Sequence, residues 1–194
     1  YITQELIYAG RRVKTITTHP DKDNPFGNQV QAFPYHFEQP DKLVETLKGC
    51  DTLFNTYWVR FNYRNWSFDQ ALANTKILFA CAKEAGVRKI VHISVTNPSE
   101  LDELPYYKGK ALQESALKES GIPYSIIRPT LVFGKEDILV NNIAWTIRKF
   151  PVVPIFGSGN YRVQPVFVKD LAEIALECVN QNDSITLDAI GPEA

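Results

Sequence analysis

The chain has 194 residues, of which 44% are hydrophobic and 22% are charged, and its formal net charge is −1. This composition is typical of one soluble globular domain, and no apolar run approaches the roughly 18 residues of a membrane span. A charge balance near zero gives no electrostatic reason to expect a nucleic-acid partner. The cysteines, Cys50, Cys81 and Cys178, lie far apart without metal-ligand spacing, so we expect no metal site and a reducing cytoplasmic location.

The first part of the chain predicts helices alternating with strands. Residues 2–9 have the spacing of an amphipathic helix, and Gly10 follows where a helix would stop. β-Branched residues at 11–18 predict a strand, which a turn-rich segment follows. We then expect a strand at 30–35, a helix at 41–48 and a strand at 51–57.

The second part continues the alternation. Ser67 and Gln70 have the spacing of a capping box and open a long helix that ends at Gly86. Residues 88–95 form a nearly continuous apolar run, as strands do when both faces of a sheet are covered. The other expected elements are a helical run after Pro105, a strand near 122–129, a helix at 141–149, and a last helix entered at Asp170, whose spacing to Glu173 resembles a capping box.

This alternation predicts an α/β fold with a doubly wound parallel sheet covered by helices on both faces. We expect one domain over 1–194, with a small substrate-side portion at about 134–165. In such sheets ligands bind outside the carboxyl ends of the strands.

Three of the four expected strand ends are polar. The residues at the four ends are Thr17, Thr18 and His19; Asn55, Thr56 and Tyr57; Ser94, Val95 and Thr96; and Arg128, Pro129 and Thr130. Strand ends meet water in any protein, so polarity at a single end does not by itself indicate a site.

Tyr106 and Lys110 form the most chemically suggestive pair. Their four-residue spacing places both side chains on one helix face, where an ammonium lowers the pKa of a neighbouring phenol. A phenol whose pKa moves toward 7 becomes useful for exchanging a proton with a carbonyl or alcohol oxygen. A hydroxyl at the end of the preceding strand, Thr96 or Ser94, could bond the same oxygen. Because such a pair also arises by chance, its position carries more weight than its spacing.

The ordered series of a strand-end hydroxyl, Tyr-x-x-x-Lys, "RPTLVFG" and "YRVQPVFVKDLAEI" resembles the short-chain dehydrogenase/reductase superfamily. The match is to its extended and atypical branch, which includes nucleotide-sugar epimerases, NmrA-like proteins and the NAD(P)-binding accessory subunit of respiratory complex I. The segments "FNTYWVRF" and "ANTKILFACAKEAGVRKIVHISV" are most similar to the last group. The resemblance covers nearly the whole chain and implies a Rossmann-like, NAD(P)-binding fold.

The resemblance also implies roles for individual residues. Tyr106 matches the acid/base of the family, Lys110 its partner that also holds the nicotinamide ribose, and Thr96 the substrate-orienting hydroxyl, with Ser94 as the fallback. Asn74 matches a helix asparagine that stabilises the site. The expected cofactor-binding residues are Thr18, His19, Asn55, Thr56, Tyr57, Lys110, Pro129 and Thr130. Asp170 matches a motif aspartate, although a helix cap explains it equally well.

The cofactor preference follows from the end of the second family strand. NAD-binding members place an acid there, whereas Thr18 and His19 stand here, so we expect NADP, unless His19 only caps its loop. The glycine-rich loop of the family and the strand before it are not found in the sequence, and we expect them upstream of Tyr1.

Two functions remain open. The first is an NAD(P)-dependent oxidoreductase or epimerase acting on an alcohol or carbonyl carbon of a small molecule. The second is a non-catalytic NAD(P)-binding sensor or accessory protein, with an oligomer or complex partner. Side chains expected to wall a pocket or partner surface are Tyr57, Trp58, Phe61, Tyr63, Trp66 and Trp145, and Arg60 and Arg64 could face an anionic ligand.

Overall fold

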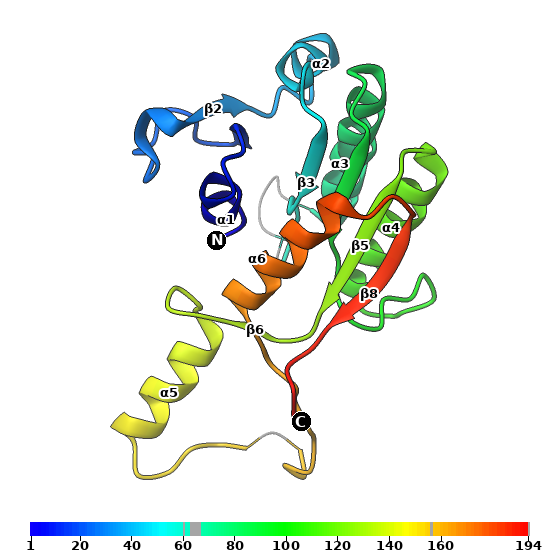
Figure 1. The fold of residues 1–194 in the computed structure, drawn as a ribbon. Helices are drawn as coiled ribbons and strands as arrows, with labels where there is room; N and C mark the ends of the chain where they lie inside the picture. The colour runs from blue at the N-terminus through cyan, green and yellow to red at the C-terminus, as the bar shows by residue number, and fades with distance from the viewer. Residues whose placement is uncertain (60, 63–66, 156, 194) are drawn as a thin grey trace.

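The computed structural model describes residues 1–59, 61–62, 67–155 and 157–193. Helices alternate with strands along the chain (Figure 1). The elements are α1 (Ile2–Tyr8), β1 (Val13–Thr17), η1 (Gly27–Gln29), β2 (Val30–Pro34), α2 (Pro40–Leu47), β3 (Thr52–Asn55), α3 (Phe68–Glu84), β4 (Lys89–Ile93), α4 (Pro105–Ser120), β5 (Tyr124–Pro129), β6 (Val132–Phe133), α5 (Leu139–Lys149), β7 (Val166–Phe167), α6 (Val168–Glu177), η2 (Cys178–Asn180) and β8 (Ile185–Ala189).

All paired strands run parallel, which confirms the predicted fold class. The main sheet has the order β3-β4-β5-β8, while β1 pairs with β2 and β6 pairs with β7. In the register of the main sheet Asn55 faces His92, and Ile93 faces Ile127. The carboxyl ends of β3, β4 and β5 therefore meet at one edge, where ligands bind in sheets of this kind.

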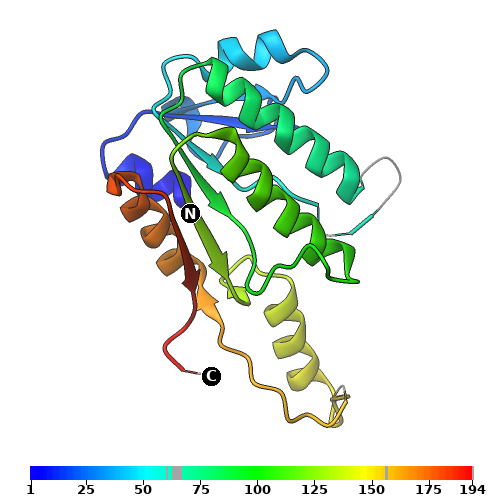
Figure 2. The ribbon, with the colours of Figure 1, turned by 90° about the vertical axis from the view of Figure 1, so that its right-hand side faces the viewer.

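Helices cover both faces of the main sheet. Neighbouring strand residues point to opposite faces, so Ile90 packs with Leu78 of α3 and Leu117 of α4 in one core cluster. Val91 joins the other cluster, which contains Leu171 of α6. Figure 2 shows α3 and α4 side by side on their face of the sheet.

The helix that carries Tyr106 and Lys110 has clear boundaries. Pro105 is the first residue of α4, where a missing backbone N–H costs nothing. The helix ends at Gly121, whose φ of +73° is left-handed and suits glycine. The predicted cap of α3 is also confirmed, because the hydroxyl of Ser67 accepts a hydrogen bond from the backbone N–H of Gln70 at 3.0 Å.

Two sequence predictions differ from the structure. The helix α6 begins at Val168 rather than at Asp170, and no side chain caps it, because Asp170 lies inside its first turn. Glu173 instead pairs with Lys169, one helical turn away, at 3.8 Å. The strand β8 was not predicted from the sequence. Its less exposed residues alternate with exposed ones, and it pairs with β5 at five positions.

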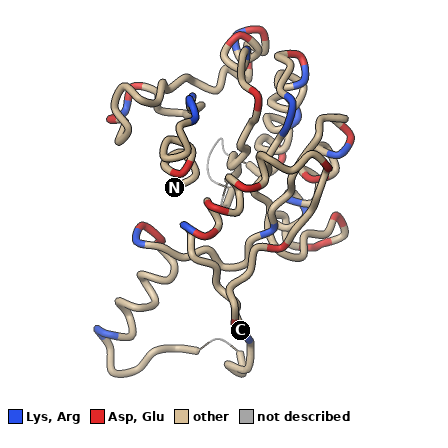
Figure 3. Tube along the Cα trace, in the orientation of Figure 1, with Lys and Arg blue, Asp and Glu red and all other residues tan. Residues whose placement is uncertain are grey.

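Residues 134–155 and most of 157–165 extend away from the sheet (Figures 1 and 2). Helix α5 lies in this segment and has no buried residue. Trp145, which belongs to this helix, is 58% exposed. Most charged residues lie along the rest of the chain (Figure 3). From 138 to 165 the charged residues are Arg148, Lys149 and Arg162.

A channel of about 1290 Å³ lies between β1 and β3. Among the described residues, β1 is hydrogen-bonded to β2 and β3 to β4, so each has a second edge that faces the channel. Helices α1 and α6 also line it, through residues such as Leu6 and Leu171. One more parallel strand at this place would join the β1-β2 pair to the main sheet.

Candidate functional site

Lys110 lies at the carboxyl end of β4 although it belongs to α4. Its ammonium group donates a hydrogen bond to the carbonyl oxygen of Ile93, the last residue of β4, at 2.8 Å. Only 4% of the residue is exposed. The four-residue spacing from Tyr106 therefore brings a basic group to the edge where a ligand is expected.

Burial lowers the pKa of Lys110 to about 7, and the nearby carboxylate of Glu114 only partly opposes this change. The centre of the Trp58 ring lies 5.4 Å from the amine, a distance at which the ring favours the charged form by about 1 kcal/mol. Desolvation outweighs both effects, since it dominates the lowering of the pKa. At neutral pH the amine is therefore charged in only part of the molecules.

The lowered pKa of Lys110 predicts a pH-dependent stability. Above pH 7 the unfolded chain binds a proton at Lys110 that the folded chain has released, so the stability rises with pH until the unfolded lysine titrates near 10.5. We expect the free energy of unfolding to rise by up to about 1.4 kcal/mol per pH unit between pH 7.5 and 9.5, relative to Lys110→Met. Urea denaturation of both proteins measures this slope.

The groups around Lys110 do not produce the same slope. Burial holds the pKa of His92 well below its ordinary value, so His92 stays neutral in this range. Parallel pH curves for the wild type and Lys110→Met would show that Lys110 keeps an ordinary pKa.

Tyr106 lies in an aromatic cluster next to Lys110. Its half-buried ring makes edge-on contacts with Trp58, Phe68 and Tyr107, at centroid distances of 6.3, 6.1 and 5.5 Å. Trp58 also stacks on Phe68 at 5.6 Å. The indole of Trp58 thus contacts both members of the predicted Tyr-Lys pair.

Thr96 and Ser94, the two candidate hydroxyls, have different surroundings. The backbone N–H of Thr96 donates to the carbonyl oxygen of Pro129 at 2.9 Å, which holds the end of β4 against the end of β5. Ser94 is buried, and its hydroxyl donates to the carboxylate of Glu114 at 2.6 Å. The hydroxyl of Ser94 therefore serves the packing of α4 on β4, which leaves Thr96 as the stronger candidate.

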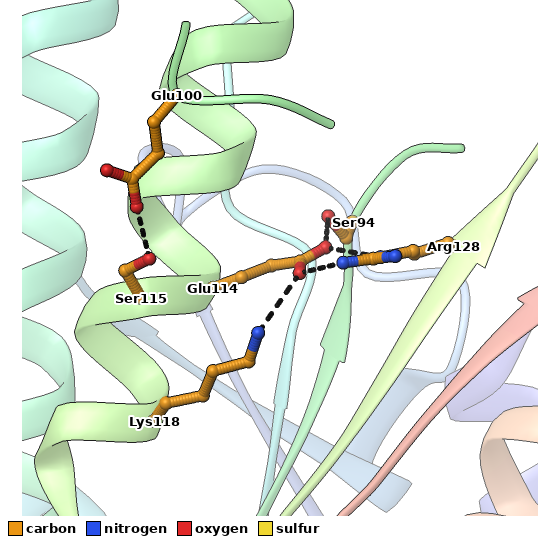
Figure 4. A network of polar contacts seen from close by, with 6 residues as sticks. All are labelled: Ser94, Glu100, Glu114, Ser115, Lys118 and Arg128. Carbon is orange, nitrogen blue, oxygen red and sulfur yellow. Dashed lines mark hydrogen bonds and ion pairs between the residues drawn. The ribbon is translucent and has the colours of Figure 1, made fainter. Parts of the chain in front are cut away.

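Sequence reasoning missed the role of Glu114. Its carboxylate is 3% exposed and accepts two hydrogen bonds from Arg128, at 2.9 and 2.6 Å, in addition to the one from Ser94 (Figure 4). Lys118 approaches the same carboxylate at 3.8 Å. The network ties α4 to β4 and β5. The spacing of Glu114 from Lys110, one helical turn, was the available signal for a carboxylate on the buried face.

Asn55 and Asn74 hold the backbone and the rings near the end of β3. The side chain of Asn55 contacts Nδ1 of His92 at 3.0 Å and accepts the backbone N–H of Tyr57 at 3.1 Å. Asn74 donates to the hydroxyl of Tyr57 at 2.9 Å. Asn55, Thr56 and Tyr57 are among the residues that line the channel between β1 and β3.

The other predicted cofactor-binding residues lie outside the lining of this channel. Thr18 and His19 are exposed, and the backbone N–H of His19 donates to the hydroxyl of Thr17 at 3.2 Å. Pro129 is buried, and the hydroxyl of Thr130 donates to the carbonyl oxygen of Gln164.

The structure describes only some of the aromatic and arginine residues that were expected to wall a pocket or partner surface or to face an anionic ligand. Phe61 and Trp145 are exposed, and neither is among the residues that line the channel between β1 and β3. Arg60, Tyr63, Arg64 and Trp66 lie outside the described residues. In the described part of the chain no cluster of three metal-ligating side chains occurs, and no helix there has the length and apolar character needed to cross a membrane.

Solved structures with this fold include nucleotide-sugar enzymes. A nucleoside-diphosphate-sugar epimerase from Staphylococcus aureus superimposes with a TM-score of 0.79 at 16% identity, over 100% of this chain and 67% of that chain. MoeE5 in complex with UDP-glucuronic acid and NAD superimposes with a TM-score of 0.77 at 19% identity, over 97% of this chain and 71% of that chain. At these identities the likeness establishes the fold alone.

Curated relatives include subunit 9 of the mitochondrial NADH dehydrogenase [ubiquinone] 1 alpha subcomplex. The Arabidopsis thaliana protein is 23% identical over 193 residues, which are 95% of this chain and 48% of the relative. The Mus musculus protein is 27% identical over 159 residues, 81% of this chain and 42% of the relative. A photosystem II assembly factor of Cyanophora paradoxa is 28% identical over 90 residues, 46% of this chain and 28% of the relative. The chain thus spans less than half the length of these relatives.

The family model described as NAD(P)H-binding matches residues 1–142. This segment contains the strand ends, the Tyr-Lys pair and the network around Glu114. The chain therefore belongs to the NAD(P)H-binding family.

Proposed function

We propose that this chain is the NAD(P)-binding part of an oxidoreductase or an epimerase/dehydratase-like enzyme that acts on an alcohol or carbonyl carbon. The observation that carries the proposal is the position of Lys110, whose amine reaches the end of β4 at Ile93 while Tyr106 stands one helical turn away. A basic amine beside a phenol at the ligand-binding edge of a parallel sheet suits proton transfer at an oxygen.

Each residue has a distinct part in this chemistry. Tyr106 exchanges the proton with the substrate oxygen, and charged Lys110 stabilises the phenolate form of Tyr106. Thr96 offers its hydroxyl to the same oxygen and so orients the substrate. A bound nicotinamide supplies or accepts hydride. The ring of Phe68, 6.1 Å from that of Tyr106, gives the site an apolar side that excludes water.

The chain offers polar groups that suit a dinucleotide. Thr56 at the end of β3 and Thr18 and His19 at the end of β1 are exposed donors and acceptors for sugar hydroxyls and phosphate. No carboxylate stands at 17–19 to repel a 2′-phosphate, so NADP is the proposed cofactor. We further propose that a parallel strand with a glycine-rich loop fills the channel between β1 and β3, and that residues 134–165 face the substrate.

A non-catalytic accessory role is the second candidate. It is supported by the packing of Trp58 against both Tyr106 and Lys110, which occupies the crevice where a substrate would react. Complex I subunits and an assembly factor among the relatives fit this role too. In that case the dinucleotide would be a structural or regulatory ligand, and the protein would act within a complex.

Cofactor titration tests the proposal and the preference together. We expect the full-length protein to bind NADPH about tenfold more tightly than NADH, followed by nicotinamide fluorescence, because the site lacks a repelling acid. His19→Asp is expected to reverse this preference, since a carboxylate repels the 2′-phosphate and accepts hydrogen bonds from ribose hydroxyls. His19→Asn is the neutral control. Absence of binding by either dinucleotide would contradict both candidate functions.

A further inference from the structure

Trp58 occupies a slot formed by Phe68 and by the reactive pair, Tyr106 and Lys110. Phe68 lies against one face of the indole, at 5.6 Å with an angle of 27° between the rings, and Tyr106 meets it edge-on at 74°. The amine of Lys110 is 5.4 Å from the ring centre. The ring thus fills the volume that borders both Tyr106 and Lys110.

Gly109 makes this position of the ring possible. A Cβ atom at Gly109 would lie 2.5 Å from Cη2 of Trp58, closer than real Cβ contacts come. Gly109 lies in the interior of α4, where alanine would give a more stable helix by roughly 1 kcal/mol. The glycine is explained by its contact with the indole and not by the needs of the helix.

The indole N–H of Trp58 is buried in this slot without a hydrogen bond. Among the residues that the structure describes, none accepts a hydrogen bond from its Nε1 atom. An unpaired buried N–H is unfavourable by comparison with one that contacts water. Burial, to which the neighbouring ring contributes by its position, keeps Lys110 partly uncharged, whereas acidification of Tyr106 needs the charged amine.

We propose that the Trp58 indole is a displaceable plug in a ligand slot, and that a flat aromatic or conjugated ring must take its place to reach Tyr106 and Lys110. Such a ring inherits the stacking face of Phe68, the edge of Tyr106 and the flat surface over Gly109. An oxygen on that ring would meet the amine of Lys110. Displacement of the indole by a polar ligand or by water hydrates Lys110 and restores its charge.

The inference rests on the proposed function only for the roles of Tyr106 and Lys110, and its test needs no turnover. Acetic anhydride labels uncharged amines, and mass spectrometry measures the labelling of each lysine. At pH 10.5, where about half of the exposed lysine side chains are uncharged, we expect Trp58→Ala to raise the labelling rate of Lys110 by about tenfold or more, because the indole no longer covers the amine. Exposed Lys108 on the same helix is the internal reference, and Trp145→Ala is the matched tryptophan control.

Two further variants keep the test independent of a loss of folding. Gly109→Ala is expected to expose Lys110 as Trp58→Ala does, because the added methyl group displaces the indole without removing it. In Trp58→Gly, free indole at millimolar concentration is expected to restore the protection of Lys110. Equal labelling of Lys110 in the wild type, Trp58→Ala and Gly109→Ala, with circular dichroism showing folded proteins, would overturn the proposal. If free indole does not protect Lys110 in Trp58→Gly, the claim that the slot accepts a flat ring is wrong.

The ring can come from the cofactor or from the substrate, and the fluorescence of Trp58 separates these sources. The signal of Trp58 is the difference between the wild type and Trp58→Phe. If the ring is the nicotinamide, NADP⁺, which does not absorb tryptophan emission, changes this signal and 2′-phospho-ADP-ribose does not. If both bind without changing it, the ring is that of the substrate.

Discussion

Replacement of Glu114 with Ala is expected to lower the free energy of unfolding by about 3–5 kcal/mol, because it leaves a partly buried guanidinium without its partner. The side chain of Arg128 is 28% exposed, and both of its hydrogen bonds to Glu114 would be lost. The hydroxyl of Ser94, which is also buried, would lose its acceptor. Such a loss is a large part of the roughly 5–15 kcal/mol that stabilises an ordinary domain.

Urea denaturation at pH 7, followed by circular dichroism, measures this loss. Glu100→Ala is the matched control. Glu100 is an exposed carboxylate that accepts a hydrogen bond from Ser115, and Ser115 lies on α4, the helix that also carries Glu114 (Figure 4). We expect the control to stay within about 0.5 kcal/mol of the wild type. Equal effects of the two substitutions would show that the network does not stabilise the fold.

A double substitution separates the ion pair from the packing of its side chains. Glu114→Leu with Arg128→Leu removes both charges, and apolar replacements of buried ion pairs are often neutral or stabilising. We therefore expect the double variant to be more stable than Glu114→Ala. A double variant as unstable as Glu114→Ala would mean that the shape of the two side chains matters more than the unpaired charge.

The fold could be predicted from the sequence because its signals are local. Ser67 with Gln70 and the apolar run at 88–95 each specify an element without knowledge of the rest of the chain. The start of α6 could not be fixed in this way, since the spacing of Asp170 and Glu173 imitates a cap inside the first turn. The two-residue strands β6 and β7 depend on pairing between distant segments, which no local pattern records.

The candidate site could be predicted only in part. The spacing of Tyr106 and Lys110 indicated a shared helix face, but it did not show that Lys110 would be buried and its pKa lowered to about 7. Trp58, which lies beside the amine, comes from the loop after β3, far away in the sequence. The aromatic pattern suggested only a pocket wall. The glycine at 109, inside a helix and without a turn to explain it, was the signal that a ring approaches α4 at this point.

Replacement of Tyr106 with Phe is expected to lower turnover by about 10²–10⁴-fold, because only the hydroxyl that exchanges the proton is removed. The aromatic contacts with Trp58 and Phe68 need the ring and not the hydroxyl, so we expect the packing of the cluster to be kept. The dissociation constant for NADPH should change by less than about twofold, since the substitution removes no charge.

The measurement follows NAD(P)H absorbance with a panel of carbonyl compounds and nucleoside-diphosphate sugars, and Tyr107→Phe is the matched control on the same helix. Tyr107 contacts the ring of Tyr106, so this control removes a neighbouring hydroxyl without touching the proposed acid/base. Equal turnover in wild type and Tyr106→Phe would remove the acid/base role from Tyr106. If the wild type binds NADPH but turns over no member of the panel, even when Trp58→Ala opens the slot, the accessory role becomes the better account. A gain of turnover in Trp58→Ala that Tyr106→Phe abolishes would instead mean that the indole blocks a working proton-transfer pair.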